Sequence, residues 1–526
     1  MHSTPLPQFF SSPPPKEEYT LARRALWFFI LLHVLVWTLI PNGVRTMLPM
    51  DALEGNVWGL HFHWGYDRNP WLNGWLTRLA VELGGQSDIF VYLLSQLCVA
   101  LAFWSIWRLG SKMLSPFQAV VSVLMLEAIQ YYTLAAVDFN DNVLELGLWP
   151  LLVFLFYEAI TRQRCRDWLG VGLIAGFAMM TKYYAIVLFL AMFAFLVWHP
   201  KARKSFQKQG LYWSALLFVA IITPHVIWLF QHDFVTMRYA LGRVHDNQHM
   251  DFWHYIAPGI SFGTMQVVTF LGAVALASVV WLRPLNLKKL GRGVSGESHT
   301  TAFSSDGGLL MNGDVAFNRQ FLWFVGVGPY LITVLLALLA GWQLYTLWGT
   351  PLLGCWGVIL LYYLQPVIKR VRFYCFLAAV LIVFSAFIGG YTFVMLKPGN
   401  TSSGNFPGRA FAEEITAVWH ARYKEPLAYV VGDRVLSGSV TRYSPDEPQA
   451  HLDWNSANNP WIDEKTLRRK GAIFLQKLNE GDDFPAEIRK RFPDLKIEGI
   501  HYMRYVRPAA DSTPIAVLVG VLPAEY

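Results

Sequence analysis

Long apolar runs separated by short polar segments make up most of this 526-residue chain. A helix needs about 20 mostly apolar residues to cross about 30 Å of hydrocarbon. About eleven runs approach that length, near residues 25–41, 88–108, 116–136, 143–161, 168–181, 183–199, 211–230, 258–282, 321–341, 350–366 and 373–395. Charged residues make up only 15% of the chain, whereas soluble domains contain about 25%. The sequence therefore predicts a polytopic α-helical membrane protein with these spans.

The segments between the runs alternate in charge. The basic segments contain Arg23 and Arg24, Arg108 and Lys112, Arg162 and Arg166, Lys201 and Lys208, Arg283 and Arg292, and Lys369 and Arg372. The opposite segments contain Asp51, Glu54, Asp67, Asp138, Asp141, Asp233, Asp246 and Asp251. Because Lys and Arg are enriched in cytoplasmic loops, the basic set is predicted to be cytoplasmic. Membrane topology thus accounts for the net charge of +7, and we expect no nucleic-acid partner.

Three regions flank or interrupt the spans. Residues 1–22 include the Pro-rich piece SSPPPKEEY and are predicted to be a cytoplasmic tail. The spans then fill residues 23–395, and a Gly/Ser-rich segment within 283–320 is predicted to be a flexible cytoplasmic loop. An odd number of spans places residues 396–526 on the outer side of the membrane.

The C-terminal part differs in composition from the spans. Strand-like runs such as LAYVVG and PIAVLVGVL occur together with helical stretches near 408–422 and 462–479. A segment of about 130 residues is long enough to have a core of its own. We therefore expect residues 396–526 to form a small extracytoplasmic α/β domain.

The first outer loop, residues 42–87, is too long for a simple connection. Its stretch MLPMDALEGNVWG contains Asp51 and Glu54, which would share one face of a helix. Its tryptophans, among them Trp58 and Trp64, favour helices that lie in the membrane interface. Ionisable residues at membrane depth usually mark functional sites. The alternative is that these acids are solvated loop residues beside an aromatic belt.

A second acidic group lies at the outer mouth of the next pair of spans. The stretch AAVDFNDNVLELG places Asp138 and Asp141 three residues apart, with Glu145 further in. These acids are candidates for a site shared with the first loop. The alternative is that Asp138 or Asp141 is the N-cap of the following helix, a role that suits aspartate.

A lysine interrupts the apolar stretch GFAMMTKYYAIV. Lys182 is followed directly by Tyr183 and could reach the interface by extending its alkyl chain. Alternatively, its ammonium group is a ligand for a lipid phosphate, because opposite charges attract strongly in a low-dielectric environment.

Three motifs together resemble a known family. The sequence DALEG opens the first outer loop, YDRNPWLNGW lies later in that loop, and GFAMMTKYYA lies in the fifth predicted span. In order and spacing they resemble motifs of the lipid-dependent glycosyltransferases of the GT-C fold. The particular resemblance is to the bacterial relatives of protein O-mannosyltransferase and aminoarabinose transferase. In the second motif, Asp67 stands for a family Glu, Arg68 for a Lys and Asn69 for a proline.

The resemblance implies an enzyme of a bacterial inner membrane. Such an enzyme takes a sugar from a polyprenyl-phosphate donor and passes it to an acceptor on the outer side, either lipid A, its core oligosaccharide, another glycolipid or a protein. Asp51 is then the expected general base, and Asp138 or Asp141 would orient the sugar or the acceptor. The other expected substrate-binding residues are Glu54, Asp67, Arg68, Lys182, Tyr183, Trp58, Trp64, Arg238 and Arg243.

Other interpretations remain open at the level of sequence. A transporter or flippase of a lipid-linked substrate would also bury acids and a lysine, although it more often places charges near mid-membrane. A sensor with an outer ligand-binding domain is a third possibility. His61 and His63, with the histidines of 245–254, have spacings that allow a divalent metal ion, but no spacing fixes its ligands.

Overall fold

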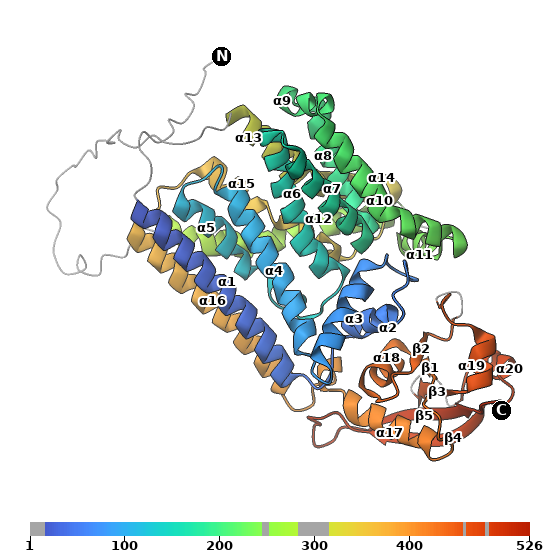
Figure 1. Cartoon of the computed structure of the whole chain (residues 1–526). Coiled ribbons are helices and arrows are strands. Elements are labelled where there is room, and N and C mark those ends of the chain that lie inside the picture. The colour runs from blue at the N-terminus through green and yellow to red at the C-terminus, as the bar shows by residue number, and fades with distance from the viewer. Residues whose placement is uncertain (1–15, 245–251, 282–314, 456–458, 479–482, 526) are drawn as a thin grey trace, which may run out of the picture.

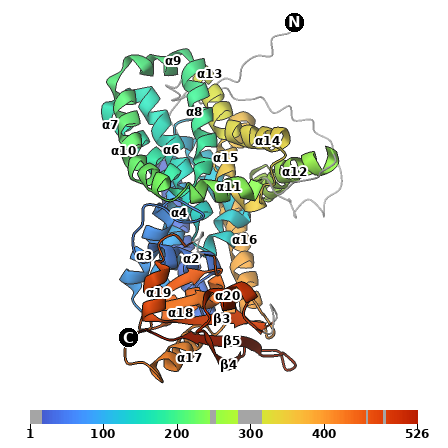
Figure 2. The same cartoon turned by 90° about the vertical axis from the view of Figure 1, so that its right-hand side faces the viewer.

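The computed structural model describes residues 16–244, 252–281, 315–455, 459–478 and 483–525. Its membrane part is a helical bundle, and a small unit containing a β-sheet lies at one end of that bundle (Figure 1). A view turned by 90° shows the same arrangement, with the sheet at one end and helix α9 (Pro200–Arg203) at the other (Figure 2).

The described part of the chain contains seven helical segments that are long and apolar enough to cross a membrane. They are α1 (Lys16–Val44), α4 (Ile89–Gly110), α6 (Asp141–Arg162), α10 (Gln209–Gln231), α12 (Phe252–Ala277) with η6 (Ser278–Val280), α13 to α14 (Val315–Ala340) and α16 (Arg370–Leu396). Three bent helix pairs raise the number to ten if each pair is one span. The predicted run at 168–181 is α7 (Cys165–Thr181), which has 17 residues. The prediction of a polytopic helical membrane protein is confirmed.

Shorter helices complete the bundle. They are α2 (Met50–Gly59), α3 (Leu72–Gly84), α5 (Pro116–Leu124), η1 (Met125–Ala128), η2 (Gln130–Tyr132), η3 (Ala135–Val137), η4 (Tyr183–Ala185), α8 (Ile186–Trp198), η5 (Lys204–Gln207), α11 (Val235–Val244), η9 (Thr346–Leu353) and α15 (Trp356–Leu364). Helix α6 is the most deeply buried of the candidate spans and packs against α4 and α7. Helices α1 and α16 lie side by side along one edge (Figure 1).

Residues 42–87, which the sequence predicts to be the first outer loop, contain the two helices α2 and α3. Helix α3 exposes Leu79 and Leu83, as expected for a helix in the membrane interface. Helix α2 is buried over nearly its whole length between α3 and a helix of the C-terminal unit. Only α3 therefore has the exposed apolar face predicted for this loop.

The C-terminal unit is built on a five-stranded mixed sheet with the strand order β2-β1-β3-β5-β4. The strands are β1 (Tyr429–Gly432), β2 (Gln449–Leu452), β3 (Ala472–Lys477), β4 (Lys496–Met503) and β5 (Ile515–Leu522). Strand β1 is parallel to β2 and β3, and β5 is antiparallel to β3 and β4. The helices are α17 (Gly408–His420), α18 (Arg434–Tyr443), α19 (Glu464–Lys470) and α20 (Ala486–Arg491). The predicted α/β composition is confirmed.

One predicted helix of this unit is wrong in its second half. Residues 462–479 were expected to be helical, but α19 ends at Lys470 and β3 follows. Gly471 has a φ of +74°, a conformation that favours glycine and stops the helix. The sequence AIFLQK then enters the middle of the sheet, where all but its last side chain are buried.

Buried polar contacts join the C-terminal unit to the membrane part. Asp88, directly before α4, accepts hydrogen bonds from the Arg442 guanidinium at 2.8 and 3.1 Å. It also accepts from Arg409 at 2.9 Å and from the Tyr443 hydroxyl at 2.8 Å. The Tyr443 oxygen in turn accepts from the Leu48 amide at 2.8 Å, just before α2. Asp88 therefore connects α18 with both α4 and the start of α2.

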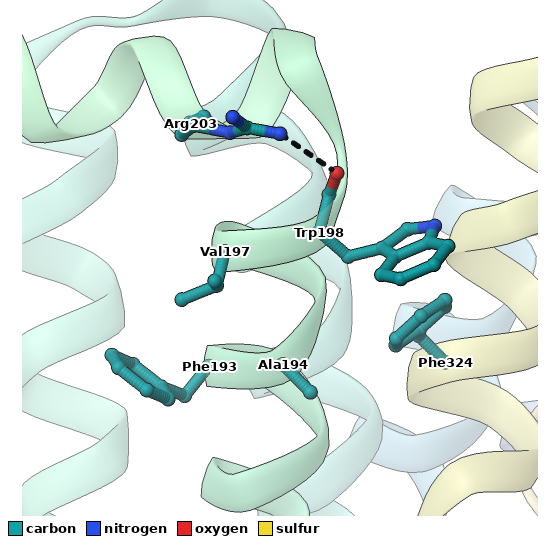
Figure 3. Close-up of a pocket in the computed structure, with 6 residues that line it drawn as sticks. All are labelled: Phe193, Ala194, Val197, Trp198, Arg203 and Phe324. Carbon is teal, nitrogen blue, oxygen red and sulfur yellow. Dashed lines mark hydrogen bonds between the residues drawn. The ribbon is translucent and has the colours of Figure 1, made fainter.

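An apolar groove lies at the end of the bundle away from the sheet. It has a volume of about 630 Å³ and is lined by Phe193, Ala194, Val197, Trp198, Arg203 and Phe324 (Figure 3). Arg203 donates to the carbonyl oxygen of Trp198 at 3.3 Å. Apolar walls of this kind suit hydrocarbon chains and offer few hydrogen-bonding partners to a sugar.

We predict that Asp88→Asn destabilises the protein by about 3–5 kcal/mol, because it leaves the buried Arg442 guanidinium without its counter-charge. Thermal unfolding in detergent measures this effect. The matched control is Glu17→Gln, which breaks an exposed ion pair with Arg370 and should change stability by less than about 1 kcal/mol. Equal effects of the two substitutions would contradict the proposed role of Asp88.

Candidate active site

The first turn of α2 and the loop before α6 are held together by side chains of both. Asp51 Oδ2 accepts a hydrogen bond from Asn140 Nδ2 at 2.9 Å. Asp138 Oδ1 accepts from the backbone amide of Ala52 at 3.2 Å. The predicted meeting of the two outer acidic groups is therefore present in the structure.

Asn140 is the N-cap of α6. Its side-chain oxygen accepts from the amides of Asn142 and Val143 at 3.0 and 3.1 Å. The prediction that Asp138 or Asp141 caps this helix is therefore wrong. Asn140 performs the capping, which leaves Asp138 to bond α2 and Asp141 to face a cation.

That cation is Lys182, which lies between α7 and η4. Its ammonium group is 2.7 Å from Asp141 Oδ2 and 2.7 Å from Asn142 Oδ1. It also lies over the ring of Trp348, 5.0 Å from the centroid. The Lys182 side chain is only 15% exposed. Its charge therefore faces the acids, which is not what a lysine extending into water would show.

A second group, which we call the carboxylate cluster, consists of Glu54, Asp67 and Asp453 around Arg68 and Arg434. Arg434 Nε is 2.7 Å from Asp453, its Nη2 is 3.2 Å from Asp67, and its Nη1 pairs with Glu54. Arg68 lies 3.5 Å from Glu54, 3.8 Å from Asp67 and 3.7 Å from Asp453. The cluster thus joins α2, the first outer loop and the C-terminal unit.

Burial and neighbouring charges set the ionisation of these acids. Burial, followed by the charge of Asp141, raises the pKa of Asp51, against a smaller lowering by Asn140, Arg68 and Lys182. Burial, followed by the charge of Asp51, raises the pKa of Asp138 well above its ordinary value. Burial also raises the pKa of Asp67 to about 7, opposed by Arg68. A carboxylate with a raised pKa is a stronger base, so Asp51 suits proton abstraction.

The two groups form one electrostatic site. The charges of both Arg68 and Lys182 act on Asp51, and the charge of Asp51 acts in turn on Arg434. The site therefore combines the partly buried Asp51, the acids of both loops and several cations at the junction of the bundle and the C-terminal unit.

A polar network inside the bundle fixes the turn that precedes Asp138. The carbonyl oxygen of Ala136 accepts from Ser95 Oγ at 2.5 Å and from Gln96 Nε2 at 2.8 Å. Gln96 contacts His33 at 3.1 Å, and the other nitrogen of His33 lies 2.9 Å from Glu127. All of these side chains are buried. Helices α1 and α4 thus help to place the loop that binds Asp51.

Trp58 and Trp64, the two tryptophans predicted to bind the substrate, differ in exposure. Trp58 is buried, stacks on Tyr66 with centroids 5.5 Å apart, and donates to Asp67 at 3.0 Å. In this structure its ring is covered by neighbouring side chains and it positions Asp67, and substrate binding by Trp58 stays a prediction. Trp64 is partly exposed and packs against Trp71 and other rings of the same loop.

Tyr183 and the predicted reserve arginines lie at the edge of the site. The Tyr183 hydroxyl is 2.6 Å from His225 Nε2, and His225 Nδ1 is 2.6 Å from the carbonyl oxygen of Trp64. Arg238 lies on α11 and is exposed. The side chain of Arg243 lies outside the described residues. Helix α11 does reach the site through Tyr239, whose ring lies 5.2 Å from the Arg68 guanidinium.

A metal site finds little support in the described part of the chain. There, no group of three or more His, Cys, Asp and Glu side chains is arranged to hold a metal ion. The rings of His61 and His63 lie 6.2 Å apart. The histidine side chains of segment 245–254 lie outside the described residues.

Sequence reasoning missed Arg434, Asp453 and Asn140. Arg434 follows β1 after a single residue, and Asp453 follows β2 directly. Strands β1 and β2 are parallel neighbours, so their carboxyl ends meet at one edge of the sheet. Ligand sites of α/β sheets gather at such edges. Polar residues directly after strand-like runs were the signal that could have identified this pair.

Comparisons with known proteins find similarity to glycosyltransferases. The family model for dolichyl-phosphate-mannose-protein mannosyltransferase matches residues 68–228. The lipid A galacturonosyltransferase RgtD of Rhizobium johnstonii is 22% identical over 218 residues, which cover 41% of this chain and 46% of RgtD. The lipopolysaccharide core galacturonosyltransferase RgtB of the same organism is 21% identical over 270 residues, covering 49% and 54%. The chain thus spans about half the length of these curated relatives.

A solved structure covers nearly the whole chain. ArnT from Cupriavidus metallidurans, bound to undecaprenyl phosphate, superposes with a TM-score of 0.52 and 12% sequence identity. The match covers 94% of this chain and 97% of ArnT. The predicted GT-C fold is confirmed.

We predict that Asn140→Ala destabilises the protein by about 1 kcal/mol, because α6 loses its N-cap. Asn140→Ser keeps a capping oxygen and should stay near wild-type stability, although both variants lose the hydrogen bond to Asp51. Thermal unfolding of the two variants in detergent tests the assignment. If alanine and serine are equally stable, Asn140 does not stabilise α6 as a cap.

Proposed function

We propose that this protein is a membrane glycosyltransferase that moves a sugar from a polyprenyl-phosphate donor to an acceptor at the outer side of a bacterial inner membrane. One observation carries the proposal: the partly buried Asp51, whose pKa is raised, shares an electrostatic site with the cations Arg68 and Lys182 at one end of a GT-C bundle. The similarity to galacturonosyltransferases and to ArnT supports it.

The residues divide between acceptor activation and stabilisation of the leaving group. Asp51 takes the proton of an acceptor hydroxyl, and the acceptor oxygen then forms a bond to C1 of the sugar. The bond between C1 and the phosphate oxygen breaks, and its electron pair leaves with the polyprenyl phosphate. Arg68 and Lys182 compensate the charge that develops on that phosphate. Asp138 holds α2 in place, and Asp141 holds Lys182.

The curated relatives suggest the first substrates to test. RgtD acts on lipid A and RgtB on the lipopolysaccharide core, and both transfer galacturonic acid. A galacturonosyl polyprenyl phosphate and a lipid A or core-oligosaccharide acceptor are therefore the leading pair. Transfer of labelled sugar to the acceptor by the reconstituted protein supports a transferase, whereas passage of labelled donor across the bilayer without transfer supports the alternative of a flippase.

We predict that Asp51→Asn lowers turnover by about 10²- to 10⁴-fold, because the general base is lost. The matched control is Asp233→Asn, an exposed outer-loop acid whose substitution should leave turnover unchanged. Radiolabelled sugar transfer by reconstituted protein measures both. Since Asp51 must be ionised and its pKa is raised, wild-type kcat/KM should fall with decreasing pH at a midpoint above the ordinary aspartate value of 3.8. Wild-type turnover in Asp51→Asn would remove Asp51 from this role.

Lys182 is expected to contribute its charge to donor binding. Lys182→Gln should weaken binding of undecaprenyl phosphate at least tenfold. The affinity of Lys182→Arg should lie between those of wild type and Lys182→Gln, because arginine keeps the charge but changes the shape of the side chain. The control is Lys208→Gln, a substitution of an exposed lysine directly before α10. If Lys182→Gln binds as tightly as wild type, Arg68 becomes the leading phosphate ligand.

The proposed orientation places the C-terminal unit outside and the basic loops in the cytoplasm. In spheroplasts treated with an impermeant maleimide, a cysteine at Lys424, an exposed position of the C-terminal unit, should be labelled at once. Native Cys165, exposed at the start of α7, should be labelled only after permeabilisation. Native Cys375 is replaced by serine in this experiment because it too is exposed. The opposite pattern would refute the orientation.

A further inference from the structure

Arg434 brings a buried cation from the C-terminal unit into the outer-loop site. We infer that Arg434 is a positioning residue. It forms ion pairs with Glu54, Asp67 and Asp453, and so keeps Arg68 available for the donor phosphate. This inference rests on the proposed function. It makes the C-terminal unit an obligatory part of the donor site.

Arg434 lies closer than Arg68 to the three acids of the carboxylate cluster. Arg434 pairs with all three acids, including contacts of 2.7 Å to Asp453 and 3.2 Å to Asp67. Arg68 lies 3.5 to 3.8 Å from the same three acids. Hydrogen bonds between guanidinium and carboxylate are normally about 2.7–2.9 Å long. Arg434 therefore makes the closer pairs, and Arg68 is held more loosely.

The side chain of Arg434 is also less exposed to solvent than that of Arg68. The side chain of Arg434 is 6% exposed, whereas that of Arg68 is 28% exposed and lies over the ring of Tyr239. A buried guanidinium that pairs with three carboxylates has little freedom to turn toward a ligand. The partly exposed Arg68 can reorient toward an incoming phosphate at small cost.

The charge balance explains why removing Arg434 would affect Arg68. In the carboxylate cluster three acids face two guanidinium groups, so its formal charge is −1. Without Arg434 the same three acids face Arg68 alone, and the formal charge of the cluster becomes −2. The larger negative charge attracts the Arg68 guanidinium more strongly, so the acids would draw Arg68 in. Arg68 would then no longer be free to bind phosphate.

The position of Arg434 is fixed from both ends of α18. Asp433 caps the first turn of the helix, accepting from the Leu436 amide at 2.8 Å. At the other end, Arg442 and Tyr443 bind Asp88. The middle of the helix packs on α2, where a Cβ at Gly438 would lie 3.3 Å from Leu53 Cβ. Arg434 is thus held at the site by contacts that do not involve the substrate.

The test measures binding of undecaprenyl phosphate to the full chain in detergent, together with KM and kcat for sugar transfer. Arg434→Gln should weaken binding at least tenfold and raise KM more than it lowers kcat. Adding Asp453→Asn restores the formal charge of the cluster to −1, with two acids facing one guanidinium, and should bring affinity back to within about threefold of wild type. Arg422→Gln, which breaks an ion pair elsewhere in the C-terminal unit, is the control and should bind normally.

Each outcome decides the inference. Weakened binding that Asp453→Asn rescues supports it. Unchanged binding in Arg434→Gln overturns it, and so does weakened binding without rescue, which would indicate that Arg434 contacts the phosphate itself. If Arg434→Gln does not fold, the double variant decides, since its near-normal affinity supports the inference and its loss of affinity overturns it. A wild-type protein that binds the lipid but transfers no sugar would refute the proposed function without affecting this test.

Discussion

The compensation of buried carboxylates by cations is the constraint on which the rest of the structure depends. An isolated charge taken out of water is unstable unless it is paired and hydrogen-bonded. At the end of the bundle that meets the C-terminal unit, Asp141 is paired with Lys182, and Glu54 and Asp67 are paired with Arg434. Each pair draws together elements that are far apart in the sequence. The ionic contacts thus define where the loops and the C-terminal unit meet.

Hydrogen bonds from uncharged donors also hold these elements in place. Asn140 links Asp51 to the cap of α6, and the amide of Ala52 binds Asp138. Deeper in the bundle, Ser95 and Gln96 hold the preceding turn through its carbonyl oxygen. Asp51, the proposed base in the first turn of α2, is therefore placed by contacts that lead back to the helices of the bundle. Placement of this kind suits a group that must meet a substrate oxygen in a defined geometry.

The sequence predicted the membrane fold and most of the residues of the candidate site, for physical reasons that differ between residues. Apolar runs and loop charges follow directly from the bilayer, so the helical bundle could be predicted. Asp51, Glu54 and Lys182 interrupt apolar surroundings and stand out for that reason, whereas Arg68 was identified through its motif. The partners Arg434 and Asp453 occur in a polar segment where charged residues are common, so only the folded contacts distinguish them. The end of α19 was missed because one glycine with positive φ separates helix from strand.

The contact between Arg434 and Asp67 spans 367 residues of sequence. During synthesis the outer-loop acids enter the membrane region long before their arginine partner exists. The site therefore reaches its final charge balance only when most of the chain has been made and α18 has docked on Asp88. Until that moment a nascent chain contains the base but lacks the complete set of cations around it. Docking of α18 thus acts as a final assembly step that separates an inserted chain from a competent one.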